Sequence, residues 1–533
     1  MRTGGKILTG IITVALFCIL FAVNVFAGED VAINATNFPD DIFRKYVSDN
    51  FDKNADRILQ GDEADVVIEI NVNSKGIASL KGIECFKNLN ILKCSSNELR
   101  SLDLSKNIAL TVLYCSDNSL ISLDVSQNTL LTNLDCSLNN LSSLDVSKNT
   151  ELKKLTCDKN NLSSLDVSGS TTLTTLVCSS NNLVSLDISK NTALTKIYCS
   201  KNELNSLDIS KNIALILLNC SSNKISNLDA SNNVALTELW CDNNELVSLN
   251  VSENNTLKYL DCQSNKLSSL NVGKSTLLTH LHCSSNKLSS LDVSKNTALY
   301  VLNCTSNVLS SLDVSKNEKL LYLYCDSNNL SSLNLSKNVK LSTAIISLQN
   351  ITIEVNDKNG KQTIDLSSYK LDSDKIKNIS DGNYNAITKK IELANTVSEG
   401  DTITYEYDTG KSNTLLKVEL MITKVNMYVE TEPQTEPKTE PPTTTEVPTE
   451  APTTEAPTEE PTIAPTEPDT TIAPTEPESE VAPTEEPTTV ATENKEDSGM
   501  PKWFIPAIVV ACVVVVGMVI VIIVVKRKKK DEE

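Results

Sequence analysis

A cysteine recurs at a fixed interval of 21 residues through the middle of the chain, and this period constrains the fold more than any other feature. The cysteines in register are Cys94, Cys115, Cys136, Cys157, Cys178, Cys199, Cys220, Cys241, Cys262, Cys283, Cys304 and Cys325. The unit from Leu110 to Asn128 reads L-x-x-L-x-C-x-x-N-x-L-x-x-L-x-V-x-x-N. Self-similarity at this period indicates a solenoid. A coil this short cannot bury its own apolar side chains, so neighbouring coils must stabilise one another.

The two halves of each unit follow the same pattern. The first eleven residues match the leucine-rich repeat core L-x-x-L-x-L-x-x-N-x-L, with cysteine in the third apolar position. Leu120, Leu123, Val125 and Asn128 then repeat the arrangement. We therefore expect two short strands per coil, one on each face. This nested unit resembles the IRREKO-type bacterial leucine-rich repeats over residues 70–350, which implies a leucine-rich repeat rod.

The cysteines should be buried and unpaired. Alternation along a strand points Leu113 and Cys115 inward. Cysteines of neighbouring coils would have Cβ atoms about 4.8 Å apart, beyond the roughly 3.5–4.5 Å of a disulfide. We expect reduced thiols that pack as small hydrophobic groups, although an even number of cysteines in a secreted chain usually indicates disulfides. Asn118 and its equivalents should form an amide ladder between coils.

The outward positions of the first strand vary from coil to coil, whereas those of the second strand are mostly Asp. Aromatic and charged residues gather in the variable positions of neighbouring coils. The candidate ligand-binding residues are Glu238, Trp240, Tyr259, Asp261, His280, His282, Tyr322 and Tyr324. Exposed aromatic groups on a rigid sheet suit a protein or glycan ligand. The alternative is that strand surfaces simply favour such residues.

A candidate Ca²⁺ site precedes the repeats, within a helical N-terminal cap over residues 28–69. Its segment resembles an EF-hand loop, which implies the ligands Asp52, Asn54, Asp56, Ile58 and Glu63. Arg57 departs from the pattern, because the loop favours Gly at that position for its sharp turn. The alternative is a polar turn without metal. Apart from this Ca²⁺, we expect no cofactor. Similar segments precede leucine-rich repeats in surface proteins of anaerobic Firmicutes, which the chain resembles overall.

Residues 351–427 change to alternating runs typical of strands, and we expect a small β-sandwich-like domain there. Residues 428–501 cycle through Thr, Glu and Pro, a composition that predicts a disordered, extended stalk. The stalk holds most of the net charge of −20. This acidity argues against nucleic-acid binding, which requires a basic surface.

Both ends carry apolar segments. Residues 1–27 have the basic start, apolar middle and small-residue end of a signal peptide, with an uncleaved anchor as the alternative. Residues 502–525 are long enough for a transmembrane helix. Basic residues follow in the short tail, residues 526–533, which is expected to be cytoplasmic. These patterns predict a single-pass membrane protein whose N-terminal bulk is extracellular.

The sequence thus predicts a β-rich solenoid with a helical N-cap, a sandwich-like C-terminal domain, a stalk and one transmembrane helix. No catalytic triad, phosphate loop or acid–base pair stands out from the repeats, so an enzyme is not expected. The function we expect is adhesion or recognition at the bacterial surface, through a protein or glycan ligand. The alternative is a structural coat or spacer protein without a specific ligand.

Overall fold

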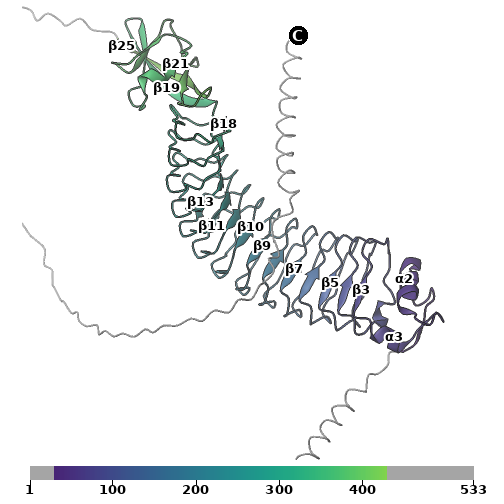
Figure 1. The fold of residues 1–533 in the computed structure, drawn as a ribbon. Helices are drawn as coiled ribbons and strands as arrows, with labels where there is room; N and C mark the ends of the chain where they lie inside the picture. The colour runs from purple at the N-terminus through teal and green to yellow at the C-terminus, as the bar shows by residue number, and fades with distance from the viewer. Residues whose placement is uncertain (1–28, 429–533) are drawn as a thin grey trace, which may run out of the picture. The chain divides into compact units, whose positions relative to one another are not determined.

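The computed structural model describes residues 29–428. Figure 1 shows stacked coils preceded by α2 and α3 and followed by a strand-rich domain. The N-terminal elements are β1 (Val31–Ala32), α2 (Asp41–Phe51), β2 (Ile58–Leu59) and α3 (Gly61–Asp65), and a 3₁₀ helix, η1, spans Ile83–Cys85. Asp40 caps α2 by accepting hydrogen bonds from the backbone N–H groups of Ile42 and Phe43. Phe43 and Val47 are the buried residues of this helix, so the N-terminal cap contributes to the hydrophobic core.

The coils contribute one strand each to a long parallel sheet. Within the described residues its strands are β3 (Glu69–Asn71), β4 (Ile91–Lys93), β5 (Val112–Tyr114), β6 (Asn133–Asp135), β7 (Lys154–Thr156), β8 (Thr175–Val177), β9 (Lys196–Tyr198), β10 (Leu217–Asn219), β12 (Glu238–Trp240), β14 (Tyr259–Asp261), β15 (His280–His282), β16 (Val301–Asn303), β17 (Tyr322–Tyr324) and β18 (Thr343–Ile345). From β4 onward the register pairs residues 21 positions apart, such as Leu113 with Leu134. The solenoid of 21-residue coils is therefore confirmed.

The prediction of a second strand in every coil is wrong. On the other face, within residues 29–428, only β11 (Asn227–Asp229) and β13 (Ser248–Asn250) pair, as a two-stranded sheet. In most coils an aspartate such as Asp103 accepts a hydrogen bond from the backbone N–H two residues on, at 2.9 Å, and Asp229 at the end of β11 makes the same contact. This turn therefore does not distinguish the paired coils from the others. The coil of β11 contains Ala230 where the preceding coil has Ile209 and the next has Val251, and the Ala230 N–H donates to the Asn250 carbonyl at 2.9 Å.

The core is a stack of Leu and Cys layers. All twelve ladder cysteines are buried, and each is a free thiol. Burial raises the pKa of Cys94 to about 12, so this thiol stays protonated at neutral pH. The prediction of buried, unpaired cysteines is confirmed.

Two asparagine ladders connect the coils. In the first, the Asn202 Nδ2 donates to the carbonyls of Cys178 at 3.0 Å and Cys199 at 3.1 Å, and its Oδ1 accepts from the Leu183 N–H at 3.0 Å. In the second, the Asn212 Nδ2 donates to the carbonyls of Ile188 and Asn191. The predicted amide ladder is confirmed, and it stabilises the turns on both sides of the coil.

The C-terminal domain contains the longest strands. They are β19 (Gln349–Lys358), β20 (Lys361–Asp365), β21 (Ile376–Lys377), β22 (Asn383–Asn385), β23 (Lys390–Glu392), β24 (Thr402–Asp408) and β25 (Leu415–Tyr428), with a 3₁₀ helix, η2, over Ser373–Lys375. They form one hydrogen-bonded sheet in the order β21-β24-β25-β19-β20-β23-β22. The sandwich-like arrangement that the sequence suggests stays a prediction. The predicted boundary at residue 351 falls inside β19.

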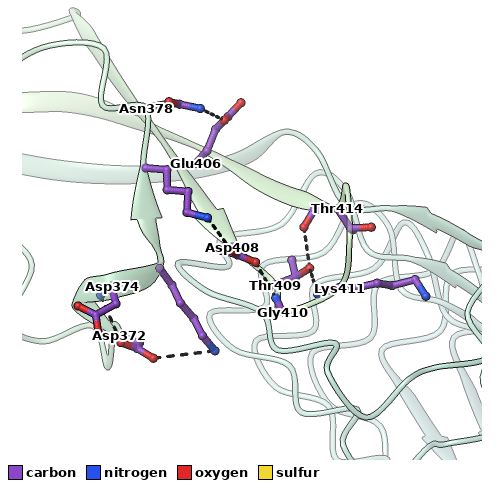
Figure 2. A network of polar contacts seen from close by, with 11 residues as sticks. Asp372, Asp374, Asn378, Glu406, Asp408, Thr409, Gly410, Lys411 and Thr414 are labelled. Carbon is purple, nitrogen blue, oxygen red and sulfur yellow. Dashed lines mark hydrogen bonds and ion pairs between the residues drawn. The ribbon is translucent and has the colours of Figure 1, made fainter.

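The domain is joined to the last coil by buried hydrogen bonds. The Tyr405 hydroxyl donates to the Ser331 carbonyl at 2.8 Å, and the Leu335 N–H donates to the Thr409 carbonyl at 2.7 Å. Figure 2 shows the polar network around the β24–β25 turn, where Asp408 accepts from Lys377 and from the Gly410 N–H. Gly410 has a positive φ of 76°, and a Cβ there would lie 3.3 Å from Ser336. The turn therefore packs closely on the solenoid.

The segments predicted at the two ends lie outside the described residues. They are the signal peptide at 1–27, all but the first residue of the stalk at 428–501, the transmembrane helix at 502–525 and the tail at 526–533. Within residues 29–428, no helix combines the length and the apolar character needed to cross a membrane.

Candidate ligand-binding face

The eight residues predicted to bind ligand lie on one face of the long sheet. Glu238 and Trp240 are on β12, and Tyr259 and Asp261 are on β14. His280 and His282 are on β15, and Tyr322 and Tyr324 are on β17. The central leucine of each strand is buried, so its two neighbours point to the opposite, outer face. The structure thus brings the eight residues together, with β16 between the last two pairs.

Their aromatic rings form a continuous row across the strands. Trp240 and Tyr259 have ring centroids 4.9 Å apart, and Tyr259 lies 5.7 Å from His280 and 5.6 Å from His282. These separations are typical of stacked or tilted aromatic pairs. Because the strands are held in register by backbone hydrogen bonds, the Cα positions of these residues are fixed relative to one another.

Tyr300 completes the row, and sequence reasoning missed it. Its ring lies 6.0 Å from His280 and 5.6 Å from Tyr322, and so bridges the strand β16 that carries no aromatic residue. Tyr300 lies just before β16, at a position that is Thr in the preceding coil, Thr279. This departure from the repeat is the sequence signal that could have identified Tyr300 as part of the face. The row therefore runs from Trp240 to Tyr322.

Asp261 lies beneath this row and is 8% exposed. It is in register with Trp240 on one side and His282 on the other. Its Oδ1 accepts a hydrogen bond from the Gln263 N–H at 3.2 Å. Burial, followed by the nearby Asp242 carboxylate, raises the pKa of Asp261 to about 7. A carboxyl that titrates near neutrality inside a candidate binding face is a frequent mark of functional sites.

Neither histidine supplies a positive charge at pH 7. Burial lowers the pKa of His280, and burial together with His280 lowers the pKa of His282 to about 4. Glu238, at the edge of the row, has its pKa raised by burial, while Lys196 and Lys258 act in the opposite direction. The face is thus aromatic and neutral to acidic around Asp261, and Lys196 and Lys258 lie near Glu238.

The EF-hand-like segment forms a compact loop. Asp52 accepts from the N–H groups of Asp56 at 3.2 Å and Arg57 at 3.0 Å. The Glu63 carboxylate, on α3, accepts from the Lys53 N–H at 2.8 Å and the Gln60 N–H at 3.1 Å. Arg57 adopts the left-handed conformation, with φ of 66°, that the loop pattern reserves for Gly.

Three other candidate ligands complete the loop. The Asn54 Oδ1 accepts from the Asp56 N–H at 3.0 Å, and the Asp56 Oδ1 accepts from the Ile58 N–H at 2.8 Å. Between Glu29 and Tyr428, no group of three or more His, Cys, Asp or Glu side chains is arranged to hold a metal ion. Ca²⁺ binding by this loop stays a prediction.

Two solved structures from Listeria monocytogenes are similar to this chain. The functional domain of InlJ, which includes a cysteine ladder, is 32% identical, covers 74% of this chain and 99% of its own, and has a TM-score of 0.56. The internalin InlF is 22% identical, covers 60% of this chain and 98% of its own, and has a TM-score of 0.54, which shows a shared fold. No family model matches the chain, and no curated protein matches it either.

Proposed function

The chain belongs to the internalin-type leucine-rich repeat proteins, and from this premise we propose that it is a recognition protein that binds a protein partner through the outer face of its long sheet. The single observation that carries the proposal is the row of rings from Trp240 to Tyr322, which spans neighbouring strands at centroid separations of 4.9–6.0 Å. Large aromatic groups in a rigid arrangement contribute most of the affinity of many protein interfaces.

The rest of the proposal concerns how this face is displayed. The apolar segment at 502–525 would anchor the chain in the bacterial membrane, and the acidic Pro/Thr-rich stalk would hold the solenoid outside the cell. In this arrangement the protein acts in adhesion and carries out no catalysis. A glycan is the second ligand class, because aromatic side chains also line many small-ligand sites.

The test is a binding screen of the full-length chain against arrayed surface proteins and glycans. A triple variant, Trp240→Ala, Tyr259→Ala and Tyr322→Ala, should lose at least about tenfold in affinity for the captured ligand, since a buried aromatic anchor contributes about 2 kcal/mol or more. Circular dichroism should show that the coils remain folded, because these side chains point away from the core.

Tyr114→Ala is the matched control, since Tyr114 occupies the Trp240 position on the distant strand β5. This control should bind as the unmodified chain does. If the triple variant keeps full affinity, or if Tyr114→Ala loses as much, the aromatic row is not the binding site. If the screen captures no protein or glycan, the structural spacer becomes the better description. Capture of glycans alone would replace the protein partner by a glycan.

A further inference from the structure

The Asp261 carboxylate is buried without a positively charged partner. It is 8% exposed and accepts one hydrogen bond, from the Gln263 N–H. No ion pair involves it in the part of the chain that the structure describes. Protein interiors rarely hold a carboxylate in this state, because the charge loses its hydration and nothing compensates for it.

The groups around Asp261 add no positive charge to compensate for its carboxylate. Tyr259 precedes it on the same strand, and the Trp240 and His282 rings flank it from the adjacent strands. Asp242, which follows β12, adds a second negative charge. The Asp242 carboxylate already accepts hydrogen bonds from the Ser221 hydroxyl and the Asn243 amide. Glu238 and His280, on the same face, supply no positive charge. Lys196 and Lys258 act on Glu238, and the groups that shift the pKa of Asp261 include neither lysine.

We propose that Asp261, together with the rings of Trp240 and Tyr259, receives the basic side chain, Lys or Arg, of the protein partner. The proposal rests on the proposed function and names the chemistry of the partner. A guanidinium or ammonium group is attracted by the faces of aromatic rings and forms a charge-assisted hydrogen bond with a carboxylate. The free Asp261 oxygen and the two adjacent rings present both features at one point, so one cation satisfies them together.

The site distinguishes this ligand from a neutral one by charge. An apolar group would cover the rings and leave Asp261 unpaired in a still less hydrated surrounding, which opposes binding. A glycan hydroxyl donates a hydrogen bond to a carboxylate but leaves its negative charge uncompensated. A cation removes that penalty. The equivalent residue on β6, Asp135, lacks these surroundings. It lies between Tyr114 and Thr156, and it accepts hydrogen bonds from both the backbone and the hydroxyl of Ser137. Asp135 therefore provides a matched comparison at the same position of another coil.

The experiment uses the fluorescence of Trp240 in the full-length chain. The chain contains two tryptophans, and a Trp503→Phe background leaves Trp240 as the only indole. The first probe is a peptide of four Gly-Ser-Arg repeats. The second is the same peptide with each Arg replaced by citrulline, which is neutral and nearly isosteric with Arg. A second pair contains Lys or acetyl-lysine. We expect each charged peptide to shift the Trp240 emission and to bind about tenfold more tightly than its neutral counterpart.

Asp261→Asn keeps the shape of the side chain and removes its charge, so it should abolish the preference for the charged peptides. Asp135→Asn should leave the preference intact. Equal binding of charged and neutral peptides, no saturable shift up to about 1 mM charged peptide, or a preference that survives in Asp261→Asn would each overturn the proposal. If the aromatic triple variant loses its captured partner while Asp261→Asn keeps it, the proposed function is supported, and the proposal that Asp261 receives a basic side chain is refuted.

Discussion

The two asparagine ladders should differ in what they contribute to stability, although both are buried. The comparison is Asn202→Ala against Asn212→Ala, which changes the same residue type within one coil. Asn202 is 6% exposed and Asn212 is fully buried. Both side chains donate to carbonyls, but only the Asn202 Oδ1 also accepts a backbone N–H, that of Leu183 at 3.0 Å. The Asn212 Oδ1 has no partner in residues 29–428.

The magnitude follows from which groups each substitution leaves unpaired. After Asn202→Ala, the carbonyls of Cys178 and Cys199 keep donors from Asn181 and Asn223, but the buried Leu183 N–H has none. The three hydrogen bonds to the carbonyls of Cys178, Cys199 and Ser200, at about 1 kcal/mol each, and the unpaired Leu183 N–H, at about 1–3 kcal/mol, give about 4–6 kcal/mol.

Asn212→Ala should be much milder. The carbonyls of Ile188 and Asn191 keep their backbone donors, Asn191 N–H and Leu194 N–H. The loss of two hydrogen bonds destabilises the fold by about 2 kcal/mol, while removal of the buried, unpaired Oδ1 stabilises it by about 1–3 kcal/mol. The net change should lie within about 1 kcal/mol of zero. Ser already occupies the equivalent positions 170 and 275, where its hydroxyl donates to one carbonyl.

Equilibrium urea unfolding followed by circular dichroism measures both variants against the unmodified chain. We expect the midpoint to fall clearly for Asn202→Ala and to change little for Asn212→Ala. Because solenoid coils unfold with their neighbours, hydrogen exchange of the surrounding coils provides a local check. Equal destabilisation by the two substitutions would refute the argument, since it would mean that the unpaired N–H has no special effect.

Three further predictions follow from the described residues. The pKa of Asp261 is raised from 3.8 to about 7, so the folded state binds more protons than the unfolded state between these values and becomes less stable as the pH rises through this window. Asp261→Asn should therefore be more stable than the unmodified chain at pH 8 and differ little from it at pH 4, as measured by urea unfolding. An identical difference at both pH values would contradict this. Tyr405→Phe leaves the buried Ser331 carbonyl without its 2.8 Å donor and should lower stability by about 1–2 kcal/mol, whereas Tyr428→Phe, at an exposed strand end, should change it little. Calorimetric titration of the full chain with CaCl₂ should show binding that Glu63→Gln abolishes. Arg57→Gly should strengthen this binding, because Gly adopts the φ of 66° without strain. Absence of binding heat in all three proteins would refute the prediction of a Ca²⁺ site.

Much of the solenoid could be predicted because a repeat states the same information in every coil. The 21-residue interval, the inward position of the cysteines and the bridging role of Asn118 all follow from side-chain alternation and stacking. The second strand could not be predicted in the same way. Its residues repeat the pattern of the first, and the Asp–Ser turn occurs both in unpaired coils and at Asp229 of β11. On that face, within residues 29–428, the backbones pair in the coils with β11 and β13 alone.

The candidate site divides in the same manner. Departures from the repeat identified its eight residues, because residues at one position of adjacent coils must lie side by side. Tyr300 was missed because it lies before its strand, and only the folded chain shows its ring between His280 and Tyr322. The state of Asp261 was also beyond the sequence, in which it is equivalent to Asp135.

The sequence alone therefore determined the period, the buried layers and the face that varies, since these depend on contacts between equivalent residues. Only the tertiary structure decided which rings touch, which asparagine oxygen lacks a partner and which aspartate loses its hydration. These properties depend on the identity of neighbours one coil away and on side-chain direction, and a repeat pattern leaves both open. The unusual chemistry of the face arises where Trp240, Tyr259 and His282 enclose Asp261.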